Sequence, residues 1–230
     1  MPSRVSLSAV LLLALSGIGF WPPYLSRPQA AHAYVHMHAV LGVIWLLLLT
    51  VQPLLIKAAM HAQHRLLGRV GVALGGVFAL SGVLLAHRSL VNMGPEQFAR
   101  EGRFVYLPLI MAVLFAAALA MAVRFRASPA LHARFMAATL LPLLDPVLAR
   151  LLYFYIPPLP AEYLYQVPSF VLIAAVLALL ARSAPATTKG RVPFAWFSIG
   201  ASLGLLGFFV IPYTDPWLAF TGWFRALPIT

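Results

Sequence analysis

The chain of 230 residues is 62% hydrophobic and only 9% charged, which excludes a soluble domain with one buried core and predicts an integral protein of the lipid bilayer. Cysteine is absent, so disulfides, iron–sulfur clusters and thiolate metal sites are excluded, and a metal would need His, carboxylate, Met or backbone oxygen ligands. The formal net charge is +11, but the basic residues are scattered between apolar runs, so we expect no nucleic-acid partner.

Seven apolar stretches are long enough to cross a bilayer, since about 30 Å of hydrocarbon needs roughly 20 helical residues. They cover approximately residues 5–22, 34–56, 65–87, 104–124, 130–154, 164–182 and 193–213. Residues 214–230 are too short and broken to span, and their aromatic residues predict an interfacial tail. We therefore predict one all-α domain, a polytopic transmembrane helical bundle of seven spans.

The first stretch also resembles a signal peptide, because Arg4 precedes an apolar run and the triplet Ala31-His32-Ala33 resembles a cleavage site. The apolar run ends near Phe20, about a dozen residues too early for that site. We expect the stretch to be retained as a span.

The distribution of Lys and Arg predicts the orientation, because cytoplasmic connections carry the excess of basic residues. One side holds Arg4, Lys57, Arg65, Arg69, Arg124, Arg126, Arg134, Arg182, Lys189 and Arg191. The other holds Arg27, Arg88, Arg100, Arg103 and Arg225, offset by Glu96, Glu101, Glu162 and Asp215. The N-terminus is predicted to be cytoplasmic and the C-terminus outside.

The stretch 34–56 carries a polar stripe, because His38, Trp45 and Gln52 recur every seven residues and so share one helix face. We expect this face to point into the bundle, where it serves either helix–helix hydrogen bonding or a functional site. His36 lies roughly 200° around the helix from His38, so the two bind one ion only if the helix begins after His36.

The stretch 65–87 follows His64-Arg65 and ends in His87. Small residues recur along it every three or four positions, at Gly68, Gly71, Gly75, Ala79, Gly82 and Ala86. Such a surface allows close approach of another helix or of a flat cofactor.

The stretch 130–154 carries His132 and Arg134 at its cytoplasmic end and Asp145 beyond the midplane, about 20 Å further along. A carboxylate at that depth should be paired, protonated or metal-bound. Arg150 is the nearest basic residue, although five positions place the two poorly on one face unless the prolines bend the helix. A structural pair with a basic residue of another helix is the alternative.

The predicted topology groups the histidines by depth. His64 and His132 share the cytoplasmic rim, each with an arginine beside it (Arg65 and Arg134), and His38 and His87 share the outer rim. Two imidazoles at equal depth on separate helices are the arrangement that a haem b with two histidine ligands needs, so both pairs are candidate haem ligands. A smaller ion would be satisfied by His and carboxylate groups at the outer rim. These candidates are His36, His38, His87 and Asp145.

These motifs resemble an uncharacterised family of bacterial predicted membrane proteins, a domain of unknown function. The resemblance covers about residues 35–155 and rests on short motifs. They are His38, Gln52, His64-Arg65-Leu66-Leu67-Gly68-Arg69, His132-Ala133-Arg134-Phe135-Met136 and Arg150.

The helix-borne histidines also resemble, more distantly, those of transmembrane b-type cytochromes and ferric reductases. Such proteins place two haem ligands on one helix about 13 or 14 residues apart, near 20 Å by helical rise. Here His38 to His61 and His64 to His87 are each 23 residues apart, about 35 Å. This spacing argues against a two-haem relay and leaves a single haem or metal site at one rim.

The favoured interpretation is a multi-pass protein of the bacterial cytoplasmic membrane that binds a haem or metal ion and exchanges electrons with a quinone-like partner. One alternative is a proton-coupled transporter or channel that uses Asp145 and Arg150. Another is a structural or assembly subunit. A retinal pump is disfavoured, because Lys57 and Lys189 both lie at predicted cytoplasmic ends and a Schiff base needs an intramembrane lysine.

Overall fold

The computed structural model describes residues 2–156, 165–182 and 188–230, and this part of the chain is helical with no strand. The α-helices are α1 (Pro2–Gly19), α2 (Ala33–Lys57), α3 (His61–Asn92), α4 (Pro95–Glu101), α5 (Tyr106–Arg124), α6 (Pro129–Ala138), α7 (Leu141–Tyr155), α8 (Val167–Arg182), α9 (Thr188–Leu206) and α10 (Asp215–Arg225). Single turns of π or 3₁₀ helix lie at Trp21–Leu25, Pro28–Ala30, Gly102–Val105, Gly207–Phe209 and Ile211–Tyr213. Glu162, assigned to the outer side from the sequence, lies outside the described residues, as do the side chains of Lys189 and Arg191.

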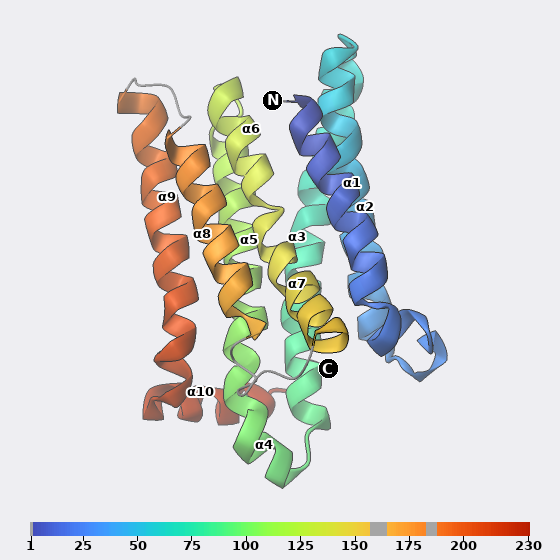
Figure 1. Cartoon of the computed structure of the whole chain (residues 1–230), viewed down its shortest axis with the longest axis vertical. Coiled ribbons are helices and arrows are strands. Elements are labelled where there is room, and N and C mark those ends of the chain that lie inside the picture. The colour runs from blue at the N-terminus through green and yellow to red at the C-terminus, as the bar shows by residue number, and fades with distance from the viewer. Residues whose placement is uncertain (1, 157–164, 183–187) are drawn as a thin grey trace.

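The long helices run side by side along the longest axis of the molecule (Figure 1). The N-terminus and the turn between α2 and α3 lie at one end. At the other end α10 lies across the bundle, with α4 beside it. An amphipathic helix that lies across the ends of apolar helices fits the predicted interfacial tail.

In the part of the chain that the structure describes, five helical segments are long and apolar enough to cross a membrane, which indicates a multi-pass membrane protein. They are Ala33–Lys57, His61–Asn92, Pro95–Arg124, Pro129–Tyr155 and Val192–Tyr213, and they match five of the seven predicted stretches. The stretches 5–22 and 164–182 correspond to two shorter apolar helices, Arg4–Gly19 and Val167–Arg182.

The segment from α6 to α7 is one apolar stretch in the sequence but two helices in the structure. α6 ends at Ala138 and α7 begins at Leu141 with Pro142 in its first turn. Proline has no N–H to donate to the preceding turn and its ring displaces the carbonyl four residues back, so the helix is interrupted there. The hydroxyl of Thr139, at this interruption, donates to the carbonyl of Met136 at 2.7 Å.

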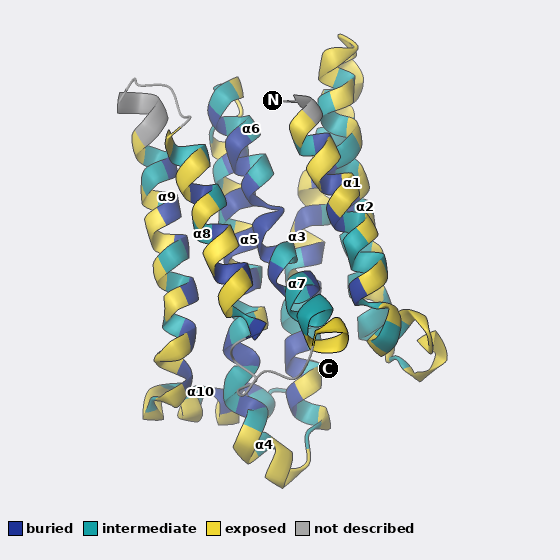
Figure 2. Cartoon of the chain, in the orientation of Figure 1, coloured by how far each residue is buried: buried dark blue, intermediate teal, exposed yellow. Residues whose placement is uncertain are grey.

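Large apolar side chains are exposed along the outer faces of the helices, and the buried residues face the neighbouring helices (Figure 2). Leu47, Val70 and Leu203 are examples of the exposed side chains. An apolar exterior of this extent would aggregate in water but is solvated by hydrocarbon, so it fits a bilayer environment.

The glycines of α3 allow α2 and α5 to approach closely. A Cβ added at Gly75 would lie 2.6 Å from Leu119 of α5 and 2.8 Å from the ring of Trp45 in α2. A Cβ at Gly71 would touch Leu48, again on α2. The predicted small-residue surface therefore serves helix packing at these positions.

Replacing Gly75 with Ala is expected to destabilise the fold by about 1–3 kcal/mol, because the new methyl group would overpack the contact with Trp45 and Leu119. Gly76→Ala is the matched control, since a Cβ there meets nothing within 4 Å. The free energies of unfolding of the two variants are measured in mixed detergent micelles. Equal stabilities of the two variants would contradict the packing role of Gly75.

Candidate functional site

The polar stripe of α2 points into the bundle, as the sequence predicts. His38 Nδ1 lies 2.8 Å from the hydroxyl of Ser81 on α3. The indole N–H of Trp45 donates to Thr139 Oγ1 at 3.2 Å. Gln52 faces α3 as well, since its amide nitrogen would lie 3.9 Å from a Cβ at Gly68. All three members of the stripe are thus directed at neighbouring segments of the protein.

His38 is held tightly by α3. Its ring stacks on Phe78 with the ring centres 4.7 Å apart, and a Cβ at Gly82 would lie 3.4 Å from its Cε1. The Ser81 hydroxyl donates to the Phe78 carbonyl at 2.7 Å, so its oxygen accepts from His38 and Nδ1 carries the proton. This contact accounts for an imidazole inside the bundle without any bound ion.

Asp145 receives its hydrogen bond from a residue that the sequence analysis missed. Ser169 of α8 donates to Asp145 Oδ1, and both side chains are almost fully buried, at 0% and 2% exposure. A lone serine in an apolar helix gives little signal in the sequence, because serine is common in membrane helices for packing. The pair fastens α7 to α8 in the outer half of the predicted bilayer.

Arg150 lies close to this pair and to His38, near enough for its charge to act on both Asp145 and His38. Its Nη1 donates to the carbonyl of Pro146 at 2.9 Å. Its guanidinium lies 4.5 Å above the centre of the Phe20 ring. The guanidinium of Arg150 is thus held against its own helix, one turn from Pro146, and against the aromatic ring that follows α1.

The outer histidines do not form the predicted metal site. His36 bonds the Tyr24 hydroxyl at 2.8 Å, on a different face of α2 from His38. His87 is fully buried, with its Nδ1 2.6 Å from Thr230 Oγ1 and its ring 5.0 Å from that of Phe224. Within the described ranges, no three His, Cys, Asp or Glu side chains come together to hold a metal ion. The grouping of His36, His38, His87 and Asp145 was based on depth alone, and their faces differ.

His64 and His132 are brought together as predicted. Their ring centres lie 6.4 Å apart with the ring planes at 89°. His132 Nδ1 lies 3.0 Å from the Ala122 carbonyl, which only accepts, so Nδ1 donates and Nε2 keeps a free lone pair. His64 Nδ1 is buried without a hydrogen-bond partner, as is Oε1 of the nearby Gln52.

The two arginines beside these histidines differ from each other. Arg65 is exposed next to His64. Arg134 is only 4% exposed and donates to the carbonyls of Ala130 at 2.9 Å and Leu180 at 3.3 Å. It lies two positions from His132, roughly 200° around the helix, and so faces α8 instead of the histidine pair. The prediction that Arg134 meets a ligand beside His132 therefore has no support in its contacts.

Ser169→Ala is expected to lower the free energy of unfolding by about 1–3 kcal/mol, because it removes the donor of a buried carboxyl group. Ser198→Ala is the matched control. Ser198 is also buried, but its hydroxyl donates within its own helix, to Phe194 at 2.8 Å, so a smaller loss is expected. The free energy of unfolding of each variant is measured in detergent. An equal loss of stability in Ser169→Ala and Ser198→Ala would argue against the Asp145 contact as the cause.

Comparison with known proteins adds no relative to this description. No family model, curated protein or solved structure matches the chain. The resemblances drawn from the histidine motifs therefore stay predictions, and the function is argued from the geometry of the site.

Proposed function

We propose that His64 and His132 hold one haem between α3 and α6 and that the protein exchanges electrons with a quinone-like partner in the bacterial cytoplasmic membrane. The observation that carries the proposal is the 6.4 Å separation of the two rings. Two imidazoles on opposite sides of one metal ion hold their centres about 6 Å apart, because each ligating nitrogen lies near 2 Å from the metal.

The hydrogen bonds of the two histidines support this role. Metal-binding histidines usually donate their second ring N–H to a carbonyl or carboxylate, which fixes the ring and leaves the other nitrogen for the metal. His132 does so through Ala122. His64 has a buried nitrogen without a partner, and a buried polar atom of this kind requires an explanation.

The number of candidate ligands favours haem over a bare ion. Protein sites for a bare transition metal supply three or four side chains. The described residues offer no group of three, whereas the porphyrin supplies four nitrogens and needs only two axial ligands. When bound, a haem supplies one-electron redox chemistry. The chain would bind and orient it through His64 and His132, and the exposed Arg65 is placed to meet an anionic group at the rim.

The transport alternative has one observation in its favour, the buried pair of Asp145 and Ser169, with the half-buried Arg150 five positions further along α7. Asp145 is hydrogen-bonded to Ser169, and the Arg150 guanidinium donates to the Pro146 carbonyl. That arrangement fits a fastening of α7 to its neighbours better than a path for a moving proton.

His64→Ala and His132→Ala are each expected to abolish haem binding, because either change removes one of the two axial ligands. The measurement is the Soret absorbance and the haem-to-protein ratio of protein purified from haem-supplied cells. His61→Ala is the control, since His61 is exposed one turn from His64. Wild-type protein without a Soret band, or both variants with full haem content, would reject the proposal.

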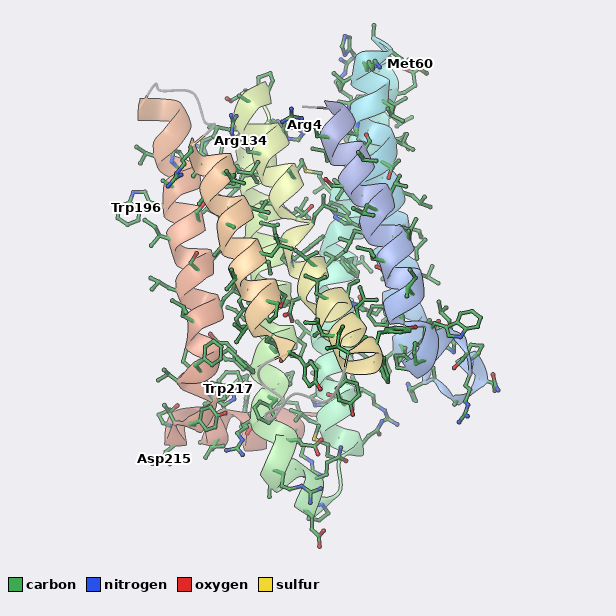
Figure 3. The ribbon with its side chains drawn as sticks, viewed as in Figure 1. Arg4, Met60, Arg134, Trp196, Asp215 and Trp217 are labelled. Atoms are coloured by element: carbon green, nitrogen blue, oxygen red, sulfur yellow. The ribbon has the colours of Figure 1, made fainter. Side chains whose placement is uncertain are left out.

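We also propose that α1 and α8 cross the membrane with the five longer segments, which gives seven spans with the N-terminus in the cytoplasm. Both lie alongside the other helices (Figure 1). Their 18 and 16 residues reach about 27 and 24 Å, close to the thickness of the hydrocarbon. Arg4, Met60 and Arg134 lie toward one end of the bundle, and Asp215 and Trp217 lie at the other (Figure 3).

Single cysteines introduced into this cysteine-free chain test the orientation. Gly94→Cys and Ala226→Cys, at the α10 end, are expected to react with a membrane-impermeant maleimide in intact spheroplasts. Gln63→Cys and Ala127→Cys, at exposed positions of the opposite end, are expected to react only after permeabilisation, because basic connections stay in the cytoplasm. The reverse labelling pattern would invert the proposed topology.

A further inference from the structure

A groove of about 580 Å³ runs along the surface between α3 and α5. Its floor is made of small residues, among them Gly76, Ala79, Ala116 and Ala120, and Arg124 and Arg126 line one end. A Cβ at Gly76 would meet nothing within 4 Å, so the groove is open at that point. Its volume lies in the range of ligand-binding clefts.

The dimensions of the groove match one leaflet of a bilayer. From Arg124 at the C-terminal end of α5 to Ala116 is about 12 Å by helical rise. Half of the hydrocarbon thickness is about 15 Å. The arginines therefore lie at the level of lipid headgroups when the small residues lie beside acyl chains.

Among the described residues, the basic side chains at this end of the bundle have no acidic counterpart nearby. Arg69 is exposed on α3 seven positions before Gly76, and so on the same helix face as the groove. The acidic side chains within the described ranges are Glu96 and Glu101 on α4, Asp145 on α7 and Asp215 on α10. α4 and α10 lie at the opposite end of the bundle (Figure 1). A cluster of exposed arginines thus adjoins an apolar groove.

We propose that this groove is a specific binding site for an anionic glycerophospholipid, with its phosphate on Arg124 and Arg126 and an acyl chain over Gly76. Basic pockets between membrane helices bind anionic headgroups in this way. Because the floor consists of glycine and alanine, an acyl chain can pack against the helix backbone, whereas larger side chains would hold it away. The inference is independent of haem binding, because it uses none of the histidines.

Native mass spectrometry of the full chain tests the proposal, with titration of phosphatidylglycerol or of phosphatidylcholine with the same acyl chains. Wild-type protein is expected to bind the first phosphatidylglycerol at least about 10-fold more tightly than phosphatidylcholine, since each basic residue near the headgroup adds about a fivefold preference. Gly76→Leu is expected to abolish tight binding by filling the groove. The double variant Arg124→Gln/Arg126→Gln is expected to lose the preference between the two lipids.

Two matched controls separate these effects from general ones. Gly200→Leu places the same side chain in open space on α9, and Arg100→Gln removes an exposed arginine from α4. Both should bind phosphatidylglycerol as the wild type does. Equal wild-type affinities for the two lipids, or unchanged binding by Gly76→Leu, would overturn the proposal. A lipid-free dimer that Gly76→Leu dissociates would also overturn it and would assign the groove to a second copy of the chain.

Discussion

A polar side chain inside a bilayer has no water to bond with, and this constraint determines how α2 sits among its neighbours. The helix carries an imidazole, an indole and an amide at equal intervals on one face. Two of them have a hydrogen-bond partner on another segment: Ser81 of α3 for His38 and Thr139 between α6 and α7 for Trp45. Rotation of α2 by one residue would break both contacts and expose both groups to lipid. The register of α2 thus fixes α3 and the interrupted helix around it.

The histidines of the chain divide into two kinds by the partners that the bundle provides. His36, His38 and His87 each have a hydroxyl partner, on Tyr24, Ser81 and Thr230. Such contacts satisfy one ring nitrogen and hold segments of the chain together, although Nε2 of His87 is buried without a partner. The rings of His64 and His132 instead lie beside each other, with their centres 6.4 Å apart and their planes nearly perpendicular. One lacks a partner for a buried nitrogen, and the other is fixed by a backbone carbonyl. The proposed haem site rests on the short distance between these two rings.

Sequence patterns predicted the helical bundle and the inward face of α2, because period and hydropathy are local properties of the chain. They also predicted which histidines share a depth. For His64 and His132, the two histidines at one predicted depth do lie close together in the structure. Depth gives no information on direction around a helix, so His36, His38 and His87 were grouped although their rings point to different segments. The contact of Ser169 with Asp145 was missed because it depends on how α8 packs against α7. Long-range packing of this kind leaves no periodic signal.

The interruption at residues 139–140 divides one predicted membrane crossing into two helices that carry different polar residues. α6 carries His132, and α7 carries Asp145 and Arg150. Short-range backbone bonds join them, from the Leu140 N–H to the Ala137 carbonyl at 3.1 Å and from the Leu143 N–H to the Leu140 carbonyl at 3.2 Å, so the regular α-helical pattern is broken only locally. The indole of Trp45 contacts the joint itself, through Thr139. A helix from elsewhere in the bundle therefore helps to set the position of the half that carries His132 relative to the half that carries Asp145.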